Sequence, residues 1–252
     1  MNKIIEFSAH EDLIDIEDIK PKPTKNFVPN WYKKIPEHKL PHLNIKGCMP
    51  FLDGITAGYV LPLPQDIKIS YNNYNPELKK NDIFIKYSAT NLYKPHSQEY
   101  CKELNINWGH AAIHGIGQIG GKDSFMVKKN NNFNILKILN PWKIKTPKGY
   151  SCLFISPVQN ENDYFNIITA IVDTDTFDDK INFPIIINAD KYSSFDKVFS
   201  RGLPYVQIIP FKRDDWENKI LKEKVNNTFI NNFVTQFVNR YKKLIWKKKK
   251  WM

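Results

Sequence analysis

Apolar and polar residues alternate with a period of two along much of the middle of the chain. Ile67–Tyr71 and Trp142–Thr146 follow this pattern, which is typical of half-buried strands. Shorter apolar runs bounded by turn residues recur at about ten-residue spacing, which favours a sandwich or barrel. We therefore expect a mainly β protein with further strands at residues 82–87, 135–139, 150–155, 167–172, 181–188 and 206–211.

The period lengthens to four residues near the C-terminus. Val225, Phe229, Phe233, Phe237 and Tyr241 recur at every fourth position, as on the apolar face of a helix. Asp214 is a suitable N-cap, and Glu217 follows three residues later. These features predict a long C-terminal amphipathic helix that starts at Asp214.

The chain divides into three regions. Residues 1–44 are rich in proline and predict an extended N-terminal arm, with Trp31 and Tyr32 in a short helical turn that packs on the core. Residues 45–213 form the predicted β core, in which residues 88–132 are an irregular, glycine-rich insertion. Residues 214–252 form the predicted helix and a basic tail.

Composition limits the class of protein. A chain of 252 residues with 42% hydrophobic residues can bury a substantial core, which excludes a mainly disordered protein. The formal net charge is +11, but seven Lys and Arg residues lie in residues 239–252 without an acid, so the rest of the chain carries only +4. The basicity is therefore largely local.

Three cysteines at wide spacing give neither a disulfide framework nor a metal-binding knuckle. The N-terminal residues lack the apolar stretch of a signal peptide, and no window approaches the ~18 apolar residues of a membrane span. We expect the cytoplasm of a host cell, or a virion, as the location, and no membrane partner.

Two carboxylates follow the apolar run at residues 167–172. Asp173 and Asp175 lie two residues apart and would share a strand face, so one could raise the pKa of the other and favour a general base. The alternative is that both cap a turn. Gln207 lies among apolar residues, where its amide either faces a polar pocket or bonds to backbone.

The pattern resembles the trimeric dUTPase and dCTP-deaminase family. Pro147–Tyr150, Ser156–Gln159, Ile171–Asp175 and Gly202–Gln207 follow the order and approximate spacing of the family's motifs, and Ala57–Tyr59 is similar to an early segment. The resemblance implies a jelly-roll or β-clip-like core. It also implies that Asp173 activates water or orients a sugar hydroxyl, and that Tyr150 and Gln207 are structural or line the pocket.

The chain departs from the family where phosphate is held. Pro157 is not followed by the family's Arg-Ser-Gly, and no glycine-rich flap lies at the C-terminus. The whole chain also resembles a family of proteins from phages and marine or environmental bacteria. That second resemblance implies a phage-related origin and no particular activity.

Histidines and lysines supply two further candidate sites. His110 and His114 have the spacing that places two imidazoles on one face of a helix, and with Asp173 or Asp175 they would hold a divalent metal. His114 and Gln118 would bind ligand if they approach the two carboxylates. Lys247, Lys248, Lys249 and Lys250, between two tryptophans, would bind nucleic acid or an acidic protein surface.

Three functions are consistent with these features. The first is a non-catalytic binding or assembly protein of phage or related origin, which forms a homo-oligomer or is a virion component and needs no cofactor. The second is a nucleotide-processing hydrolase on a modified dUTPase-like scaffold, with Asp173 and Asp175 as catalytic residues. The third is a metal-dependent enzyme built on His110, His114 and a carboxylate.

Overall fold

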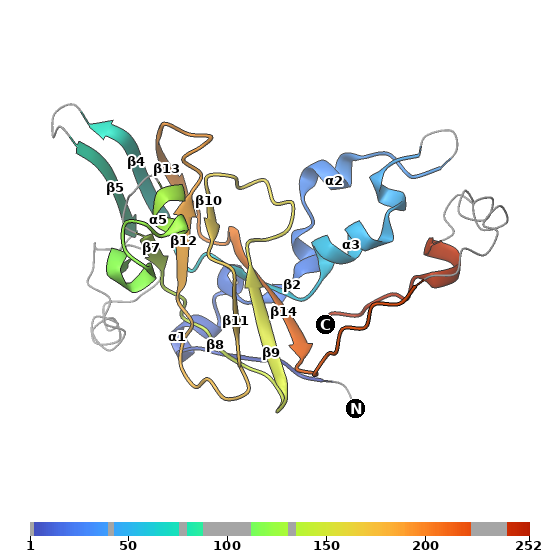
Figure 1. Ribbon diagram of the computed structural model, residues 1–252. Coiled ribbons are helices and arrows are strands. Elements are labelled where there is room, and N and C mark those ends of the chain that lie inside the picture. Colours follow the sequence, from blue (N-terminus) through green and yellow to red (C-terminus); the bar gives the residue numbers. More distant parts are fainter. Residues whose placement is uncertain (1–2, 40–42, 76–79, 88–111, 131–134, 223–240) are drawn as a thin grey trace.

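The structure is a computed structural model that describes residues 3–39, 43–75, 80–87, 112–130, 135–222 and 241–252. Its strands form four antiparallel sheets, so the prediction of a mainly β protein is confirmed (Figure 1). No helix within these ranges combines the length and the hydropathy that crossing a membrane requires.

The largest sheet has five strands in the order β11-β9-β14-β3-β2. They are β11 (Ala170–Val172), β9 (Tyr150–Ile155), β14 (Pro204–Lys212), β3 (Tyr59–Pro62) and β2 (Lys22–Pro23). The next sheet has the order β10-β12-β7-β6. Its strands are β10 (Phe165–Ile167), β12 (Phe183–Ile187), β7 (Ile135–Ile138) and β6 (Ala112–His114).

Two smaller sheets complete the β structure. One has the order β13-β4-β5 and contains β13 (Ser194–Phe199), β4 (Ile67–Asn75) and β5 (Lys80–Tyr87). The other pairs β1 (Glu6–Ser8) with β8 (Lys143–Lys145). The arm thus contributes β1 and β2 to sheets whose other strands lie far along the sequence.

The helices of the described ranges are short. They are α1 (Glu11–Ile14), η1 (Glu17–Ile19), η2 (Thr24–Phe27), α2 (Asn30–Lys34), η3 (Ile45–Gly47), α3 (Met49–Thr56), η5 (Ile116–Ile119), α5 (Phe125–Lys129) and the π-helical turn η6 (Tyr241–Ile245). The predicted helical turn after Pro29 is confirmed as α2.

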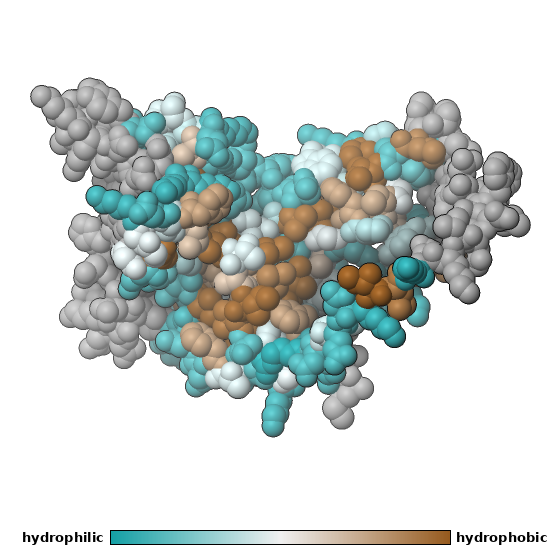
Figure 2. Space-filling model, viewed as in Figure 1, coloured by the Kyte–Doolittle hydropathy of each residue, from teal (hydrophilic) through white to brown (hydrophobic). Residues whose placement is uncertain are grey.

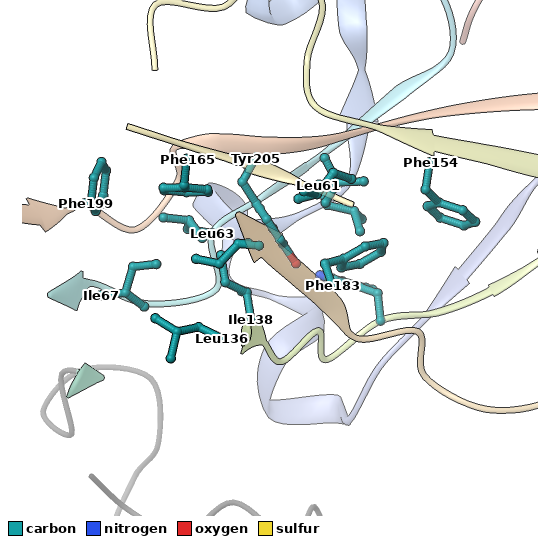
Figure 3. Packing of buried hydrophobic residues seen from close by; sticks show 14 of the residues in the cluster. Leu61, Leu63, Ile67, Leu136, Ile138, Phe154, Phe165, Phe183, Phe199 and Tyr205 are labelled. Carbon is teal, nitrogen blue, oxygen red and sulfur yellow. The ribbon is translucent and has the colours of Figure 1, made fainter. Parts of the chain in front are cut away.

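Aromatic side chains join the two largest sheets into one core. The Phe183 ring of β12 lies 5.5 Å from Phe154 of β9 and 5.8 Å from Tyr205 of β14, and all three are buried (Figure 3). Phe165 and Phe199, 5.1 Å apart, connect the β13 sheet to the same cluster. Burying one such side chain contributes about 1.5–3 kcal/mol, so this contact layer is a main source of stability.

The N-terminal arm packs on this core. Leu13 and Ile19 are fully buried, and the Trp142 Nε1–H donates to the Ile19 carbonyl at 3.1 Å. Between α3 and β3, Gly58 has φ +69°, and a Cβ there would lie 1.9 Å from the Ile208 carbonyl oxygen. Only glycine allows the chain to enter β3 this close to β14.

Two sequence predictions for the β core are wrong in part. Residues 167–172 do not form one strand, because the chain leaves β10 after Ile167 and β11 begins at Ala170. Residues 112–130 of the predicted irregular insertion contain β6, η5 and α5, while residues 88–111 lie outside the described ranges.

The predicted C-terminal helix does not begin at Asp214. Residues 214–222 have no regular secondary structure, and the Asp214 carboxylate pairs with the Lys212 ammonium instead of capping a helix. Residues 223–240, the centre of the predicted helix, lie outside the described ranges, and η6 follows them.

Candidate functional site

Asp173 and Asp175 lie in the turn that follows β11. The Asp173 carbonyl accepts hydrogen bonds from the N–H groups of Thr176 at 3.1 Å and Phe177 at 2.8 Å, which closes the turn. Thr174, between the two acids, is fully buried and its hydroxyl lies 2.7 Å from that of Thr146. One side chain of the turn therefore points inward, and its neighbours are left to face the end of the sheet.

Arg213 binds both carboxylates. Its NH1 group lies 3.1 Å from Asp173 Oδ1 and 2.8 Å from Asp175 Oδ1, and its NH2 group pairs with Asp175 Oδ2. The Gly149 N–H donates to Asp175 Oδ2 at 2.8 Å, and the Ser151 hydroxyl donates to Asp173 Oδ1 at 2.6 Å. We call Asp173, Asp175 and Arg213 the carboxylate clamp.

The clamp favours the charged form of Asp175. The Arg213 guanidinium, followed by the Gly149 N–H, lowers the pKa of Asp175 from 3.8 to about 2. The expectation that the paired acids raise a pKa is therefore wrong for Asp175. A carboxylate with so low a pKa, engaged by a bidentate arginine, is a weak general base at neutral pH.

The two acids do converge, as their spacing predicted, but a cation lies between them. Asp173 is the more accessible, with 61% of its side chain exposed against 3% for Asp175. Arg213 was not predicted as part of the site. No local sequence pattern indicates it, because Arg213 reaches the acids through the antiparallel pairing of β14 with β9, in which Lys212 lies opposite Tyr150 and Arg213 lies beside Gly149.

Gln207 lies in the middle of β14 and is fully buried. Its Oε1 accepts from the Val158 N–H at 2.9 Å, and its Nε2 donates to the carbonyls of Gly54 at 3.1 Å and Ala57 at 2.8 Å. Both amide hydrogens are used by backbone oxygens. Gln207 thus ties β14 to α3 and to the segment after β9.

Tyr150 begins β9, next to the carboxylate clamp. Its carbonyl accepts from the Thr146 hydroxyl at 3.1 Å and from Arg213 NH1 at 3.3 Å, and the Lys3 ammonium lies 5.4 Å from the centre of its ring. The backbone of Tyr150, rather than its phenol, takes part in the clamp.

His114 and Gln118 lie together but away from the carboxylates. His114 Nδ1 is 2.9 Å from Gln118 Oε1, which also accepts from the Gly115 N–H at 3.1 Å. His114 ends β6, so the helical placement of the histidine pair is wrong at this residue, and His110 lies outside the described ranges. No hydrogen bond or ion pair joins His114 or Gln118 to Asp173 or Asp175 in the described structure.

The described residues contain no group of three or more His, Cys, Asp or Glu side chains placed to hold a metal ion. Cys152 lies in β9 near the clamp, and burial raises the pKa of its thiol to about 11 although the Thr174 hydroxyl lowers it slightly. A buried thiol with this pKa is not nucleophilic at neutral pH.

The basic tail lies against α3 and β3. The Asp53 carboxylate accepts from the Trp246 indole N–H at 3.0 Å and from the Lys249 ammonium at 2.5 Å. The Tyr59 hydroxyl donates to the Met252 carbonyl at 3.0 Å. Lys247, Lys248 and Lys250 have no ion pair with the described residues.

A groove of about 450 Å³ separates the N-terminal arm from β13 and β14. The Glu161 carboxylate accepts from the N–H groups of Asn30 at 3.1 Å and Trp31 at 3.3 Å, which fastens the arm at this rim. Inside, the Lys197 ammonium lies 3.9 Å from the centre of the Tyr164 ring. The lining is Phe27, Val28, Pro29, Asn30, Asn160, Glu161, Asn162, Tyr164, Lys197, Val198, Phe199, Ser200, Leu203 and Pro204.

Comparisons with known proteins give no family. No protein-family model matches the chain, and no curated protein sequence matches it. Among solved structures, a dUTPase variant of Staphylococcus bacteriophage 80alpha with dUpNHpp aligns over 89% of this chain and 93% of that chain, at 11% identity and a TM-score of 0.34. A TM-score of 0.34 does not establish a shared fold, so this alignment assigns no role to any residue here.

Proposed function

We propose that the protein is a non-catalytic binding or assembly protein of phage or related origin, with a jelly-roll or β-clip-like core, that assembles with copies of itself. The observation that carries the proposal is the segment Asp214–Lys222, which leaves β14 without regular secondary structure. Trp216 is 90% exposed, Ile220 92% and Leu221 72%. We call residues 214–222 the exposed arm.

The exposed apolar side chains of this arm indicate that it binds a protein partner. Single apolar side chains in water are common, but three large and strongly exposed ones within six residues are a concentration that marks interaction sites. Figure 2 shows brown, apolar side chains on the C-terminal part of the chain that Figure 1 draws in red, which comprises the exposed arm and residues 241–252. Burying the three side chains against a second copy would contribute about 1.5–3 kcal/mol each.

The carboxylate clamp agrees with a non-catalytic role. Asp173 and Asp175 hold the end of the largest sheet together through Arg213, and the lowered pKa of Asp175 suits an ion pair better than proton transfer. Within the described residues, no observation specifically favours the nucleotide hydrolase or the metal-dependent enzyme.

Sedimentation velocity over a concentration series tests the proposal. The wild-type protein should sediment as an oligomer, and Trp216→Ser with Ile220→Ser should shift it to the monomer. Phe125→Ser with Ile4→Ser is the matched control, since these side chains are 76% and 65% exposed elsewhere. A monomeric wild type, or equal dissociation of both double variants, would refute assembly through the exposed arm.

A further inference from the structure

A second cavity, of about 580 Å³, lies between the N-terminal arm, α3 and the C-terminal tail. Its lining comes from three parts of the chain that are far apart in sequence, and it combines cations with aromatic rings. The lining is Tyr32, Glu37, His38, Lys46, Met49, Leu52, Lys242 and Trp246. We call it the tail cavity.

Two of the three charged side chains that line the tail cavity are lysines, Lys46 and Lys242, and the third is Glu37. Lys46 and Lys242 come from distant parts of the sequence, and no carboxylate pairs with either in the described structure. The Lys46 ammonium instead donates to the Lys33 carbonyl at 3.2 Å and lies 5.9 Å from the centre of the Tyr32 ring. The acid of the lining, Glu37, pairs with Lys39 at 3.8 Å.

Further lysines continue this charge along the chain on both sides. Lys33 and Lys34 belong to α2, Lys243 follows Lys242, and residues 247–250 follow Trp246. Asp53, the acid near Trp246, is already paired with Lys249. The lysines extend beyond the tail cavity on both sides, so together they attract an anion that is longer than the cavity.

His38 adds a directed hydrogen-bond donor. Its Nδ1 accepts from the Asn44 N–H at 2.8 Å, so the neutral imidazole carries its proton on Nε2. No described residue accepts from that Nε2. The ring lies over Gly47, where an added Cβ would be 2.4 Å from Nε2, so glycine is required to seat the imidazole here.

Trp246 gives the tail cavity an aromatic ring that a base could stack on. Trp246 lines it and is fixed by its indole N–H on Asp53 at 3.0 Å. Tyr32 also lines the cavity but is largely buried. Its ring stacks on Phe51 at 5.7 Å, and Trp31, which is 38% exposed, packs edge-on against both rings. Lysines beside a fixed aromatic ring are the combination that binds single-stranded nucleic acid without reading sequence.

We propose that the tail cavity and the lysines that flank it bind single-stranded nucleic acid. The inference rests on the proposed binding function and names its partner. The Lys46, Lys242 and tail ammonium groups contact phosphates, the Trp246 ring stacks on a base, and the His38 Nε2–H donates to a phosphate or base oxygen. A cavity of about 580 Å³ admits a nucleotide unit. A base must leave its own stack to pack on the Trp246 ring, which a single strand allows and a double helix opposes.

Fluorescence anisotropy with labelled oligothymidine of roughly 16 nucleotides tests the proposal on the full chain across a salt series. The wild-type protein should bind more weakly as salt rises, since each phosphate contact contributes about 0.7 to the slope of log K against log salt. Lys46→Gln with Lys242→Gln should lower affinity and make the slope shallower by about 1.4. Lys122→Gln with Lys148→Gln removes the same net charge elsewhere and should leave the slope nearly unchanged.

Trp246→Ala tests stacking and should weaken binding about 5- to 150-fold, whereas Trp246→Phe keeps a ring and should retain most affinity. The inference is overturned if oligothymidine does not bind, if both lysine pairs lose affinity equally, or if a duplex binds as tightly. Preferred binding of polyglutamate would identify an acidic protein partner and overturn it too. Sedimentation of the same samples separates the two proposals: lost nucleic-acid binding with an intact oligomer overturns only this inference, and a monomer that still binds overturns only self-assembly.

Discussion

Replacing Gln207 by methionine separates a structural role of this amide from a ligand-binding one. Methionine has nearly the same volume as glutamine, so the substitution removes hydrogen bonds without opening a large cavity. The amide makes three hydrogen bonds, to Val158, Gly54 and Ala57, and the side chain is fully buried.

The expected loss follows from these three bonds. Each intramolecular hydrogen bond contributes about 1 kcal/mol net, so Gln207→Met should lower the free energy of unfolding by about 3 kcal/mol. The Val158 N–H loses its acceptor and accounts for a large share, whereas the Ala57 carbonyl keeps the Thr24 hydroxyl at 2.8 Å. For a chain of this size, about 3 kcal/mol lowers the melting temperature by about 6–12 °C.

Urea unfolding followed by tryptophan fluorescence measures this difference, and the m-value should not change. Gln118→Met is the control, because that exposed amide contacts His114 and Gly115 near the surface and should shift stability by less than about 0.5 kcal/mol. If Gln207→Met changes the free energy of unfolding as little as the control does, the three hydrogen bonds of Gln207 do not stabilise the fold. The reasoning about β14 would then fail.

Three further changes probe the clamp, the entry to β3 and the buried thiol. Asp175→Asn should destabilise the protein at neutral pH. Because folding lowers the pKa of Asp175, its ionised carboxylate stabilises the folded protein at pH values above 3.8, and this stabilisation is lost as the pH falls to about 2. The difference in unfolding free energy between wild type and variant should therefore shrink over this pH range. A difference that is constant with pH would contradict the ion pair. Gly58→Ala should cost more than about 3 kcal/mol in unfolding free energy, since it adds left-handed strain to a clash with the Ile208 carbonyl. Gly54→Ala, in a helix with open space at its Cβ, should instead stabilise by about 0.5–1 kcal/mol, and similar effects at both glycines would refute the argument. Cys152→Ser should leave the number of thiols that react with DTNB at about pH 8 unchanged in the native state and lower it by one after unfolding; fewer native-state reactive thiols would show that Cys152 is accessible.

Local patterning predicted the strands whose side chains alternate against the core. Tyr150–Ile155 was predicted with both of its ends, because Gly149 closes the preceding turn with φ +84° and the strand has a buried face. β13 was not predicted. Ser194–Phe199 buries only Phe199 fully and is held at the edge of its sheet by pairing with β4, which no local period reveals.

The sequence indicated the two acids of the candidate site but not the arginine that binds them. The two-residue spacing of Asp173 and Asp175 places both carboxylates at one sheet end, but Arg213 arrives through the pairing of β14 with β9, about forty residues away. His114 shows the same limit, since its backbone pairs with Ile135 in a strand ladder. Long-range pairing decided both outcomes, and a single sequence does not contain it.

The carboxylate clamp also explains why the exposed arm starts where it does. The Arg213 N–H donates to the Gly149 carbonyl at 2.9 Å, so the backbone is still held to the sheet at the residue whose side chain binds Asp173 and Asp175. Strand β14 ends at Lys212, and residues 214–222 continue without regular secondary structure and with exposed side chains. The Asp173 and Asp175 carboxylates and the Gly149 carbonyl therefore hold Arg213, the residue that precedes the exposed arm. The acids that resemble a catalytic pair thus anchor the segment through which we propose that the protein assembles.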